Sequence, residues 1–403
     1  MENIYLVDAK RTAIGTVGKT LANYPVSDLG AIVVKELVTK HNIDSNDIDE
    51  IITGNVLSAL AGQGVGRQVV IKSGLAQAIC GHTINMVCGS GLRSVVNAYS
   101  LIKAQEAKLI IAGGSENMSL APYGVAGARY GLKLGDTKLV DSMVFDALTD
   151  AYEGIHMGIT AENVAKNFNI TREMQDEFAY HSQQKALNAI ENGYFKEEIV
   201  PVVIKNRKGE TVFTTDEHPN AGSTLEKLAT LKPAFKNEGT VTAGNASGLN
   251  DGAAYVLVAN EEMVEKYQFQ PMAKIIGWAQ AGLDPNVMGL GPAYAIEKLL
   301  IKTNFSLDDI DLFELNEAFA AQALGVVKEM SRIFEVSEQS ILKRANCCGG
   351  AIALGHPVGS SGTRILTTLV HQMKRLNKKY GIAALCIGGG MGIAMLVENM
   401  EYK

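Results

Sequence analysis

The hydrophobic pattern of the chain predicts an α/β protein. Short apolar runs typical of buried strands alternate with longer segments in which apolar residues recur every three or four positions, as on one face of a helix. The first strand is predicted at residues 5–7, and the next helix carries Leu29, Ile32, Val33 and Leu37 on one face.

A sharp turn from a strand into a helix is predicted at residues 87–91, Val-Cys-Gly-Ser-Gly. An apolar extended run precedes it, and an apolar helical stripe from Leu92 to Ile102 follows it. We expect Cys88 at the N-terminal end of this helix, where free N–H groups and the helix dipole favour the thiolate. A cysteine is more often a small buried hydrophobe, but the adjacent glycines allow a ligand to approach closely.

The same plan returns late in the chain. Residues 47–49, Asp-Ile-Asp, have a counterpart in residues 309–311, and each copy leads to a strand that ends near an asparagine, Asn55 or Asn316. A period this long is not that of a solenoid. We interpret the chain as two copies of one α/β unit: residues 1–118 with 249–262 form the first half, residues 119–248 an inserted loop domain, and residues 268–403 the second half.

The repeat gives Cys88 a partner. The glycine-dense segment 349–357 places His356 at the position equivalent to the Cys88 turn, so the two loops are expected to converge on one pocket. A histidine within hydrogen-bond reach can take the thiol proton. A lone histidine is otherwise most often structural, and His371 is expected on a solvated helix face.

Two more groups are candidates for chemistry at this pocket. Cys386 ends the strand that pairs, in this scheme, with the strand at residues 109–112. Gly388 opens a run of three glycines whose N–H groups can bind an oxyanion. Asn316 can hold a water or donate to a carbonyl oxygen. A buried core cysteine and an ordinary asparagine turn remain alternative interpretations.

Composition excludes several classes of protein. The 403 residues predict two or three domains, and a net charge of −6 offers no electrostatic footprint for nucleic acid. We expect neither a signal peptide nor a membrane span, because the longest apolar stretch, 382–397, is short and interrupted by glycines. Five cysteines, with Cys347 and Cys348 adjacent, match no usual zinc spacing. We therefore expect no metal, free thiols and a cytoplasmic location.

With these residues assembled, the chain resembles the thiolase family over essentially its full length. The matching segments are residues 87–91, 113–118, 156–158, 239–247, 316–319, 349–357 and 386–392. The resemblance implies a five-layered αβαβα fold made of two similar halves, with a loop domain inserted in the first. Within the family, the chain is similar to the short-chain, acetoacetyl-CoA type.

The resemblance also implies a reaction. Two acetyl-CoA would give acetoacetyl-CoA and CoA by a reversible Claisen condensation through an acetyl-cysteine at Cys88, with CoA thioesters as substrates and no cofactor. His356 would activate Cys88, and Cys386 would move the α-proton. His356, with a water held by Asn316, would form one oxyanion hole, and the N–H groups of Cys88 and Gly388 the other. A homotetramer built as a dimer of dimers is implied, with part of residues 119–140 at the tetramer contact.

Positions matched to the family's CoA contacts lie mainly in the inserted region. They are His156, Met157, Phe235, Ala243, Ser247, Ala318 and Phe319. Met157 is expected to limit the acyl pocket. The chain departs from the family pattern at Asn220, often an arginine, at Lys227, often a serine, and at Cys348, usually an asparagine. Lys227 or His218 is expected to compensate for the lost guanidinium at the nucleotide end.

Three other functions are weighed against this one. The first is a thiolase for longer 3-ketoacyl-CoA substrates, which differs from the short-chain type in its preferred acyl-chain length. A decarboxylating or HMG-type synthase of the same fold generally lacks a second cysteine at the Cys386 position. A non-catalytic lipid-binding relative is expected to have lost Cys88, His356 or Cys386. For a thiolate at Cys88, we expect preferential labelling of this residue by iodoacetamide.

Overall fold

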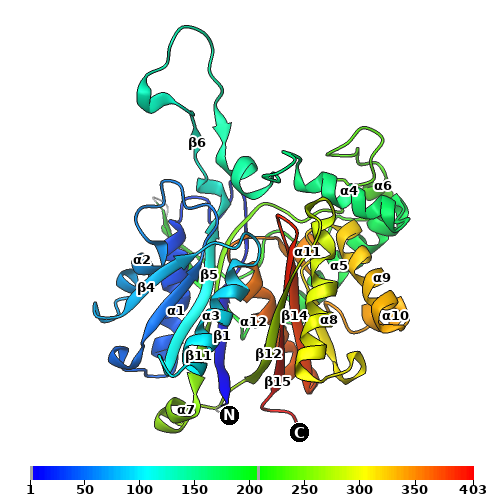
Figure 1. The fold of residues 1–403 in the computed structure, drawn as a ribbon. Coiled ribbons are helices and arrows are strands. Elements are labelled where there is room, and N and C mark those ends of the chain that lie inside the picture. Colours follow the sequence, from blue (N-terminus) through cyan, green and yellow to red (C-terminus); the bar gives the residue numbers. More distant parts are fainter. Residues whose placement is uncertain (1–2, 207–208) are drawn as a thin grey trace.

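The computed structural model describes residues 3–206 and 209–403. In this part of the chain, 11 strands form one main sheet, whose path runs β13-β14-β15-β12-β1-β11-β5-β3-β4 (Figure 1). The first half of the fold contains β1 (Ile4–Thr12), β2 (Gly15–Thr16), α1 (Val26–Lys40), β3 (Glu50–Gly54), α2 (Val65–Lys72), β4 (Cys80–Ile84), α3 (Ser90–Lys103), β5 (Leu109–Asn117), β11 (Asn250–Asn260) and α7 (Glu261–Tyr267).

The second half repeats this arrangement. It contains β12 (Ala273–Gly282), α8 (Gly291–Thr303), β13 (Leu312–Leu315), α9 (Ala320–Phe334), α10 (Glu338–Leu342), α11 (Ala351–Leu354), α12 (Ser361–Leu376), β14 (Tyr380–Ile387) and β15 (Met391–Asn399). The order β12-β15-β14-β13 mirrors β1-β11-β5-β3. The predicted pairing of the strand that ends at Cys386 with the strand at residues 109–112 is therefore wrong. β14 and β5 correspond across the halves, but β14 pairs with β13 and β15, whereas β5 pairs with β11 and β3.

Matched hydrogen bonds confirm the repeat. The Asp49 carboxylate accepts the N–H groups of Lys108 and Leu109 at the start of β5. In the second half, the Asp311 carboxylate accepts the N–H groups of Lys379 and Tyr380 at the start of β14. The Asp-Ile-Asp signature thus fastens the turn before one strand to the start of its parallel neighbour in both halves.

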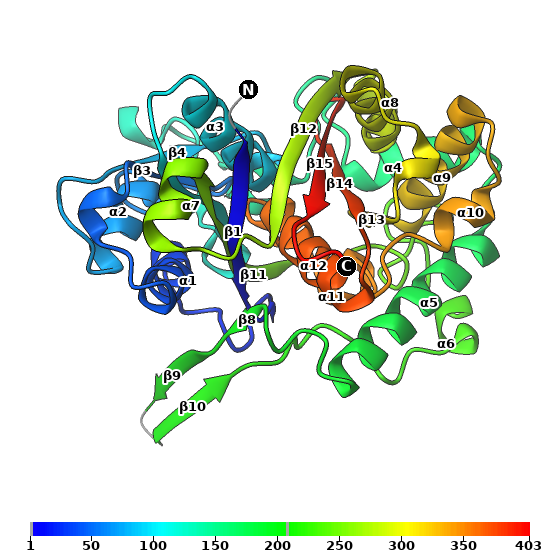
Figure 2. The ribbon, with the colours of Figure 1, turned by 90° about the horizontal axis from the view of Figure 1, so that it is seen from below.

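The two halves of the sheet meet along a short seam. β1 and β12 share only two paired positions, Tyr5 with Lys274 and Leu6 with Ala273. Helices α3 and α12 fill the space between the diverging halves, and one apolar core joins them to strands of both (Figures 1 and 2). Helices α1, α2 and α7 cover the outer face of the first half, and α8 and α9 that of the second. These are the five layers of the expected αβαβα fold.

Helix α12 is buried on all sides. Every residue from Ser361 to Met373 is buried, including the polar ones. The expectation that His371 lies on a solvated face is therefore wrong: its Nε2 donates to the Ala9 carbonyl at 2.9 Å. The helix occupies the middle layer, where strands lie on both sides.

The inserted region contains β6 (Tyr123–Gly124), β7 (Val140–Asp141), α4 (Met157–Asn167), α5 (Arg172–Glu191), β8 (Ile199–Val200), β9 (Val202–Asn206), β10 (Gly209–Phe213) and α6 (Leu225–Ala229). It joins the main sheet through β8, which pairs with β1. The buried Arg11 of β1 bonds Asp216 and Glu198 of the insertion. β9 and β10 form an antiparallel hairpin (Figure 2), whose turn at residues 207–208 lies outside the described residues.

Among the helices in residues 3–206 and 209–403, none combines the length and the apolar character needed to cross a membrane.

Candidate active site

Cys88 lies at the predicted strand-to-helix turn. β4 ends at Ile84, and α3 begins at Ser90 after a residue with positive φ, Val87 at 47°. The Ser90 hydroxyl donates to the Val87 carbonyl at 2.6 Å and accepts the Met86 N–H at 2.8 Å. These two bonds close the turn and hold Cys88 at the entrance of the helix.

The resting state of the Cys88 thiol differs from the expectation. Burial raises its pKa to about 11, and the Glu116 carboxylate also raises it, while the N–H groups of Gly388 and Cys88 lower it by a smaller amount. Burial therefore opposes the predicted thiolate of Cys88. The helix terminus favours the thiolate, but desolvation in a packed site outweighs it. The proton must be removed as the thiol reacts.

His356 is set up as a neutral base. The backbone N–H of His356 donates to Asn250 Oδ1 at 2.9 Å, and the ring Nδ1 of His356 lies 2.6 Å from Ser361 Oγ. The Ser361 hydroxyl proton goes to the Pro357 carbonyl at 2.9 Å, so Ser361 accepts from Nδ1–H and the lone pair is on Nε2. Burial lowers the imidazole pKa to about 3, with a further contribution from the Arg364 charge.

Asn316 faces the free nitrogen of this imidazole. Its Nδ2 lies 3.5 Å from His356 Nε2, and its backbone N–H donates to the Ala384 carbonyl at 3.0 Å. Its side-chain Oδ1 is buried and accepts no hydrogen bond from any residue that the structure describes. An unpaired buried amide oxygen next to a base is a position for a bound water or a substrate group. This fits the role expected from the sequence.

Cys386 and Gly388 complete the site from the second half. Cys386 is buried at the end of β14, and burial together with the nearby Cys88 raises its pKa. The Gly388 N–H faces the Cys88 sulfur. A Cβ built on Gly388 would lie 3.5 Å from Val87 and 3.6 Å from the Met157 sulfur. One site therefore contains the two thiols, the glycine N–H and Met157.

The two predicted loops converge as the repeat requires. A Cβ on Gly54, beside Ser90, would lie 2.8 Å from the Gly359 carbonyl, and one on Gly91 would lie 2.9 Å from the Thr363 N–H. No hydrogen bond joins the Cys88 thiol to the His356 ring in the described residues of the unliganded site. Catalytic hydrogen bonds often tighten only when substrate binds.

The candidate CoA residues form a wall beside Met157. The His156 ring stacks on Phe235 with centroids 4.6 Å apart, and Phe235 meets the Phe319 ring edge-on at 5.9 Å. The Ser247 N–H donates to the Ala318 carbonyl at 2.9 Å. Segments far apart in the sequence thus build one surface with aromatic and apolar character.

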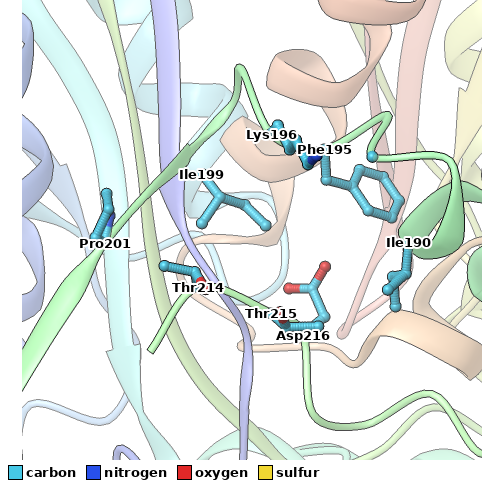
Figure 3. A pocket seen from close by; sticks show the side chains of 9 residues that line it. Ile190, Phe195, Lys196, Ile199, Pro201, Thr214, Thr215 and Asp216 are labelled. Carbon is cyan, nitrogen blue, oxygen red and sulfur yellow. The ribbon is translucent and has the colours of Figure 1, made fainter. Parts of the chain in front are cut away.

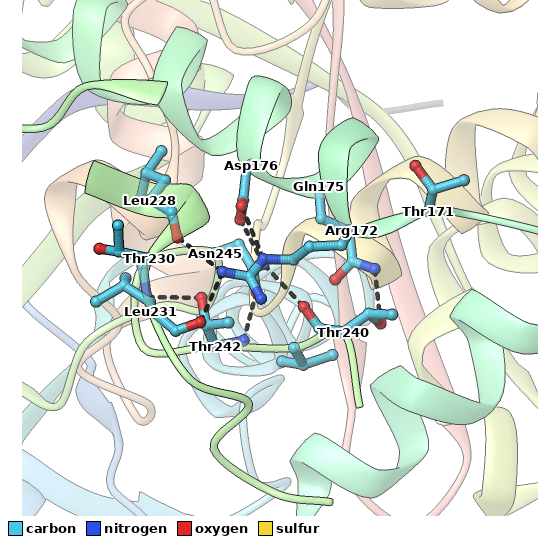
Figure 4. Close-up of polar contacts among 12 residues, drawn as sticks. Thr171, Arg172, Gln175, Asp176, Leu228, Thr230, Leu231, Thr240, Thr242 and Asn245 are labelled. Carbon is cyan, nitrogen blue, oxygen red and sulfur yellow. Dashed lines mark hydrogen bonds and ion pairs between the residues drawn. The ribbon is translucent and has the colours of Figure 1, made fainter. Parts of the chain in front are cut away.

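The remaining CoA candidates lie on a loop and on α6, both of which are held by α5 (Figure 4). Arg172 donates to the carbonyls of Leu228 and Leu231 and to Asp176, whose other oxygen accepts from Asn245. Ala243 is exposed on the loop that rests on α6. Lys227 is exposed on α6, where its ammonium bonds the Gly222 carbonyl at 2.8 Å. These two residues make no contact with the catalytic groups in the described part of the chain.

Three positioning residues were missed by sequence reasoning. Ser361 and Asn250 orient His356, and Glu116 accepts N–H groups from Val56, Leu57 and Gly359. Glu116 is fully buried, which raises its pKa to about 7. The sequence carried a signal for two of them, since Ser361 stands in the Gly-Ser-Ser-Gly run that opens α12 and Glu116 lies in the family-like segment 113–118.

One cavity outside this site offers no free catalytic group. A cavity of about 260 Å³ lies between the end of α5 and residues 199–201 and 214–216 (Figure 3), but its carboxylate, Asp216, is paired with Arg11 at 2.7 Å. Within residues 3–206 and 209–403, no group of three or more His, Cys, Asp or Glu side chains is arranged to hold a metal ion.

Comparisons with known proteins agree with this geometry. Residues 4–262 match the family "Thiolase, N-terminal domain" and residues 269–399 match "Thiolase, C-terminal domain". The acetyl-CoA acetyltransferase of Escherichia coli is 52% identical over 402 residues, covering 100% of both chains. That of Cupriavidus necator is 50% identical, covering 99% of this chain and 100% of the relative.

Solved structures are similar over nearly the whole chain. The Bacillus anthracis acetyl-CoA acetyltransferase superposes with a TM-score of 0.95 at 42% identity, covering 99% of both chains. The human mitochondrial 3-ketoacyl-CoA thiolase in complex with CoA has a TM-score of 0.92 at 41% identity, covering 99% of this chain and 98% of that one. With two family domains matched in order around a Cys88, His356 and Cys386 site, the chain belongs to the thiolase family.

Proposed function

We propose that the protein is an acetyl-CoA C-acetyltransferase, which condenses two acetyl-CoA to acetoacetyl-CoA and CoA and also runs in reverse. The observation that carries this proposal is the juxtaposition of the Cys88 and Cys386 thiols with the Gly388 N–H beside Met157. Relatives named acetyl-CoA acetyltransferase at 52% and 50% identity support it. In this reaction the CoA thioesters are substrates, and no cofactor takes part.

The first half-reaction makes an acetyl-cysteine. The Cys88 sulfur attacks the thioester carbonyl while Nε2 of His356 takes the thiol proton, which the high thiol pKa and low imidazole pKa require to happen together. The N–H groups of Cys88 and Gly388 stabilise the tetrahedral oxyanion. As the intermediate collapses, the C–S bond to CoA breaks, and Cys386 gives its proton to the leaving CoA thiolate.

The second half-reaction forms the carbon–carbon bond. The Cys386 thiolate takes an α-proton from the second acetyl-CoA, and His356 with a water on Asn316 stabilises the enolate oxygen. The enolate carbon attacks the acetyl-cysteine carbonyl. Collapse releases acetoacetyl-CoA, and the Cys88 thiolate recovers its proton from His356. Electrostatic stabilisation of this kind contributes about 3 kcal/mol for each well-placed donor.

CoA is proposed to lie over the inserted region. Its acyl end would contact His156, Met157 and Phe235, its pantetheine arm Ser247, Ala318 and Phe319, and its nucleotide end the loops carrying Ala243 and Lys227. The stacked rings and the contact between Ser247 and Ala318 support one continuous surface.

Acyl-chain length separates this function from its alternative. Similarity to the human mitochondrial 3-ketoacyl-CoA thiolase, with a TM-score of 0.93 at 42% identity, keeps longer substrates as a second candidate. Met157 beside Gly388 narrows the acyl end and favours the C4 substrate. The test is kcat/KM for thiolysis of C4 and C8–C16 3-ketoacyl-CoA, with Cys88→Ala as the inactive control. A preference for long chains, or activity retained in Cys88→Ala, contradicts the proposal.

We also propose a homotetramer built as a dimer of dimers. The hairpin that contains β6 and β7 projects from the body of the fold (Figure 1), and its apolar side chains face solvent in the single chain. Leu134 is fully exposed and Tyr130 is 89% exposed. Large exposed apolar groups on one projection support contact with further copies of this chain. Sedimentation of the full chain and of a variant lacking residues 125–138 tests this assembly.

Two further assignments belong to the same proposal. We divide the chain into residues 1–118 with 249–262, the insertion 119–248, and residues 268–403. The return of β11 beside β5 supports this division. We assign a cytoplasmic location, which the five free cysteines and the need for reduced Cys88 and Cys386 support. Limited proteolysis and cell fractionation test the two assignments.

A further inference from the structure

A second pair of thiols lies outside the catalytic site. Cys347 and Cys348 are adjacent in the chain, and their sulfur atoms are 4.0 Å apart. Cys348 is fully buried in an apolar cluster with Ala186, Phe195 and Leu354, whereas Cys347 is half-buried. One sulfur of the pair is therefore accessible to a small reagent, and the other is packed directly behind it.

Two cations surround this pair from different helices. Arg375 of α12 lies 4.0 Å from the Cys348 sulfur, stacks on the Tyr194 ring at 3.8 Å and bonds Gln372. Lys185 of α5 bonds the Ala345 carbonyl at 3.2 Å. No carboxylate lies within ion-pair distance of either cation in the described residues. Their charges are thus held in place without being neutralised.

The charges around Cys347 favour its thiolate. The Cys348 S–H, Arg375 and Lys185 lower its pKa against the opposing effect of burial. The buried Glu314 of β13 also faces Cys347, and Glu314 and Glu198 face Cys348, whose pKa is raised. One thiol of the pair is therefore prepared to attack, and its neighbour keeps a proton to give.

We propose that Cys347 is a reactive site for hydroperoxides and that Cys348 resolves its oxidised form into a reversible Cys347–Cys348 disulfide. The Cys347 thiolate attacks the peroxide oxygen, the O–O bond breaks, and hydroxide or alkoxide leaves, which produces a sulfenic acid. The Cys348 sulfur then attacks the Cys347 sulfur. The S–O bond breaks, and the hydroxide takes the Cys348 proton and leaves as water.

The covalent geometry makes this disulfide easy to reduce. Consecutive Cα atoms are about 3.8 Å apart, whereas unstrained disulfides usually join Cα atoms about 4.4–6.8 Å apart. A strained disulfide has a more oxidising potential and is the labile kind. The site is thus suited to a switchable modification. It differs from the catalytic thiols Cys88 and Cys386, whose pKa values are raised.

Peptide mapping of the full chain after oxidation tests the proposal. The protein is treated with increasing hydrogen peroxide, free thiols are blocked with N-ethylmaleimide under denaturing conditions, and the chain is digested with trypsin. The peptide of residues 345–364 contains Cys347 and Cys348 and no other cysteine. We expect it to become lighter by two hydrogen atoms and unlabelled before Cys88 or Cys386 reacts, and to recover its label after dithiothreitol.

Variants separate the roles of the two sulfurs. In Cys348→Ser, oxidation should stop at a sulfenic acid on Cys347 that dimedone captures. In Cys347→Ser, Cys348 should stay alkylatable after peroxide. Arg375→Gln should slow oxidation at pH 7 several-fold, and Cys80→Ser is the matched control that leaves the rate unchanged. Earlier oxidation of Cys88 or Cys386, or full labelling of Cys347 and Cys348 after peroxide, overturns the proposal.

Discussion

The Ser361 hydroxyl accepts a hydrogen bond from His356 Nδ1 at 2.6 Å and donates a hydrogen bond to the Pro357 carbonyl at 2.9 Å. This chain of bonds fixes which ring nitrogen carries a proton, and it leaves Nε2 free toward Asn316. Ser361 therefore determines which ring nitrogen of His356 can act as the base.

Removing this acceptor should impair catalysis without weakening binding. When His356 becomes positively charged in the reaction, its bond to Ser361 becomes a charge-assisted one, which contributes about 1.5–3 kcal/mol. We expect Ser361→Ala to lower kcat by about 10- to 100-fold with KM little changed. Ser360→Ala is the control, because Ser360 donates to the same Pro357 carbonyl at 3.2 Å but does not contact His356. Equal losses in both variants would refute the role of Ser361.

The pH dependence of alkylation should report the protonated resting state of Cys88. Because its pKa is raised to about 11, the thiolate fraction increases throughout the neutral range. We expect the rate of iodoacetamide inactivation to rise about tenfold per pH unit from about pH 7 to pH 9, without a plateau. Prior acetylation by acetyl-CoA should protect Cys88 and leave Cys347 reactive. A plateau near neutral pH would instead indicate a thiolate.

Glu116 should be sensitive even to its closest isostere. Its two carboxylate oxygens accept from Asn55 and Leu57 and from Val56 and Gly359, and all four partners are N–H donors. A glutamine must turn an NH₂ group toward one of these pairs. We expect Glu116→Gln to lower the free energy of unfolding by roughly 2 to 4 kcal/mol.

Urea denaturation measures this loss. Glu106→Gln is the control, since Glu106 is exposed on the surface, and its stability should be close to that of the parent protein. If Glu116→Gln is as stable as Glu106→Gln, the four hydrogen bonds to the Glu116 carboxylate do not stabilise the fold.

A methyl group at Gly388 should narrow the acyl end of the site. The added Cβ would touch Val87 and the Met157 sulfur at ordinary contact distances, so the fold should persist. We expect Gly388→Ala to reduce kcat/KM for acetoacetyl-CoA about tenfold, because the methyl group takes up space in which the acyl group is proposed to lie. Gly282→Ala is the control, because its Cβ would meet only the Gly390 carbonyl at 3.9 Å. Full activity with a normal melting temperature would place the acyl group elsewhere.

Local patterns in the sequence predicted much of the fold. The first predicted strand, residues 5–7, lies within β1, Ile4–Thr12, and the predicted apolar stripe from Leu92 to Ile102 lies on α3, Ser90–Lys103. The turn at Cys88 and the repeat centred on Asp49 and Asp311 are also confirmed. These features are readable because caps, glycine turns and apolar periodicity depend on residues close together in the chain.

Other properties were decided only by tertiary structure. His371 was expected on a solvated helix face, yet α12 buries it together with Arg364, because strands pack on both sides of this helix. Burial of the Cys88 thiol likewise raises its pKa and so opposes the ionisation expected for it. Desolvation and long-range partners such as Ser361 and Asn250 depend on what the folded chain places around a group. The sequence by itself therefore determined which residues carry the chemistry, and the packed structure decided their protonation and orientation.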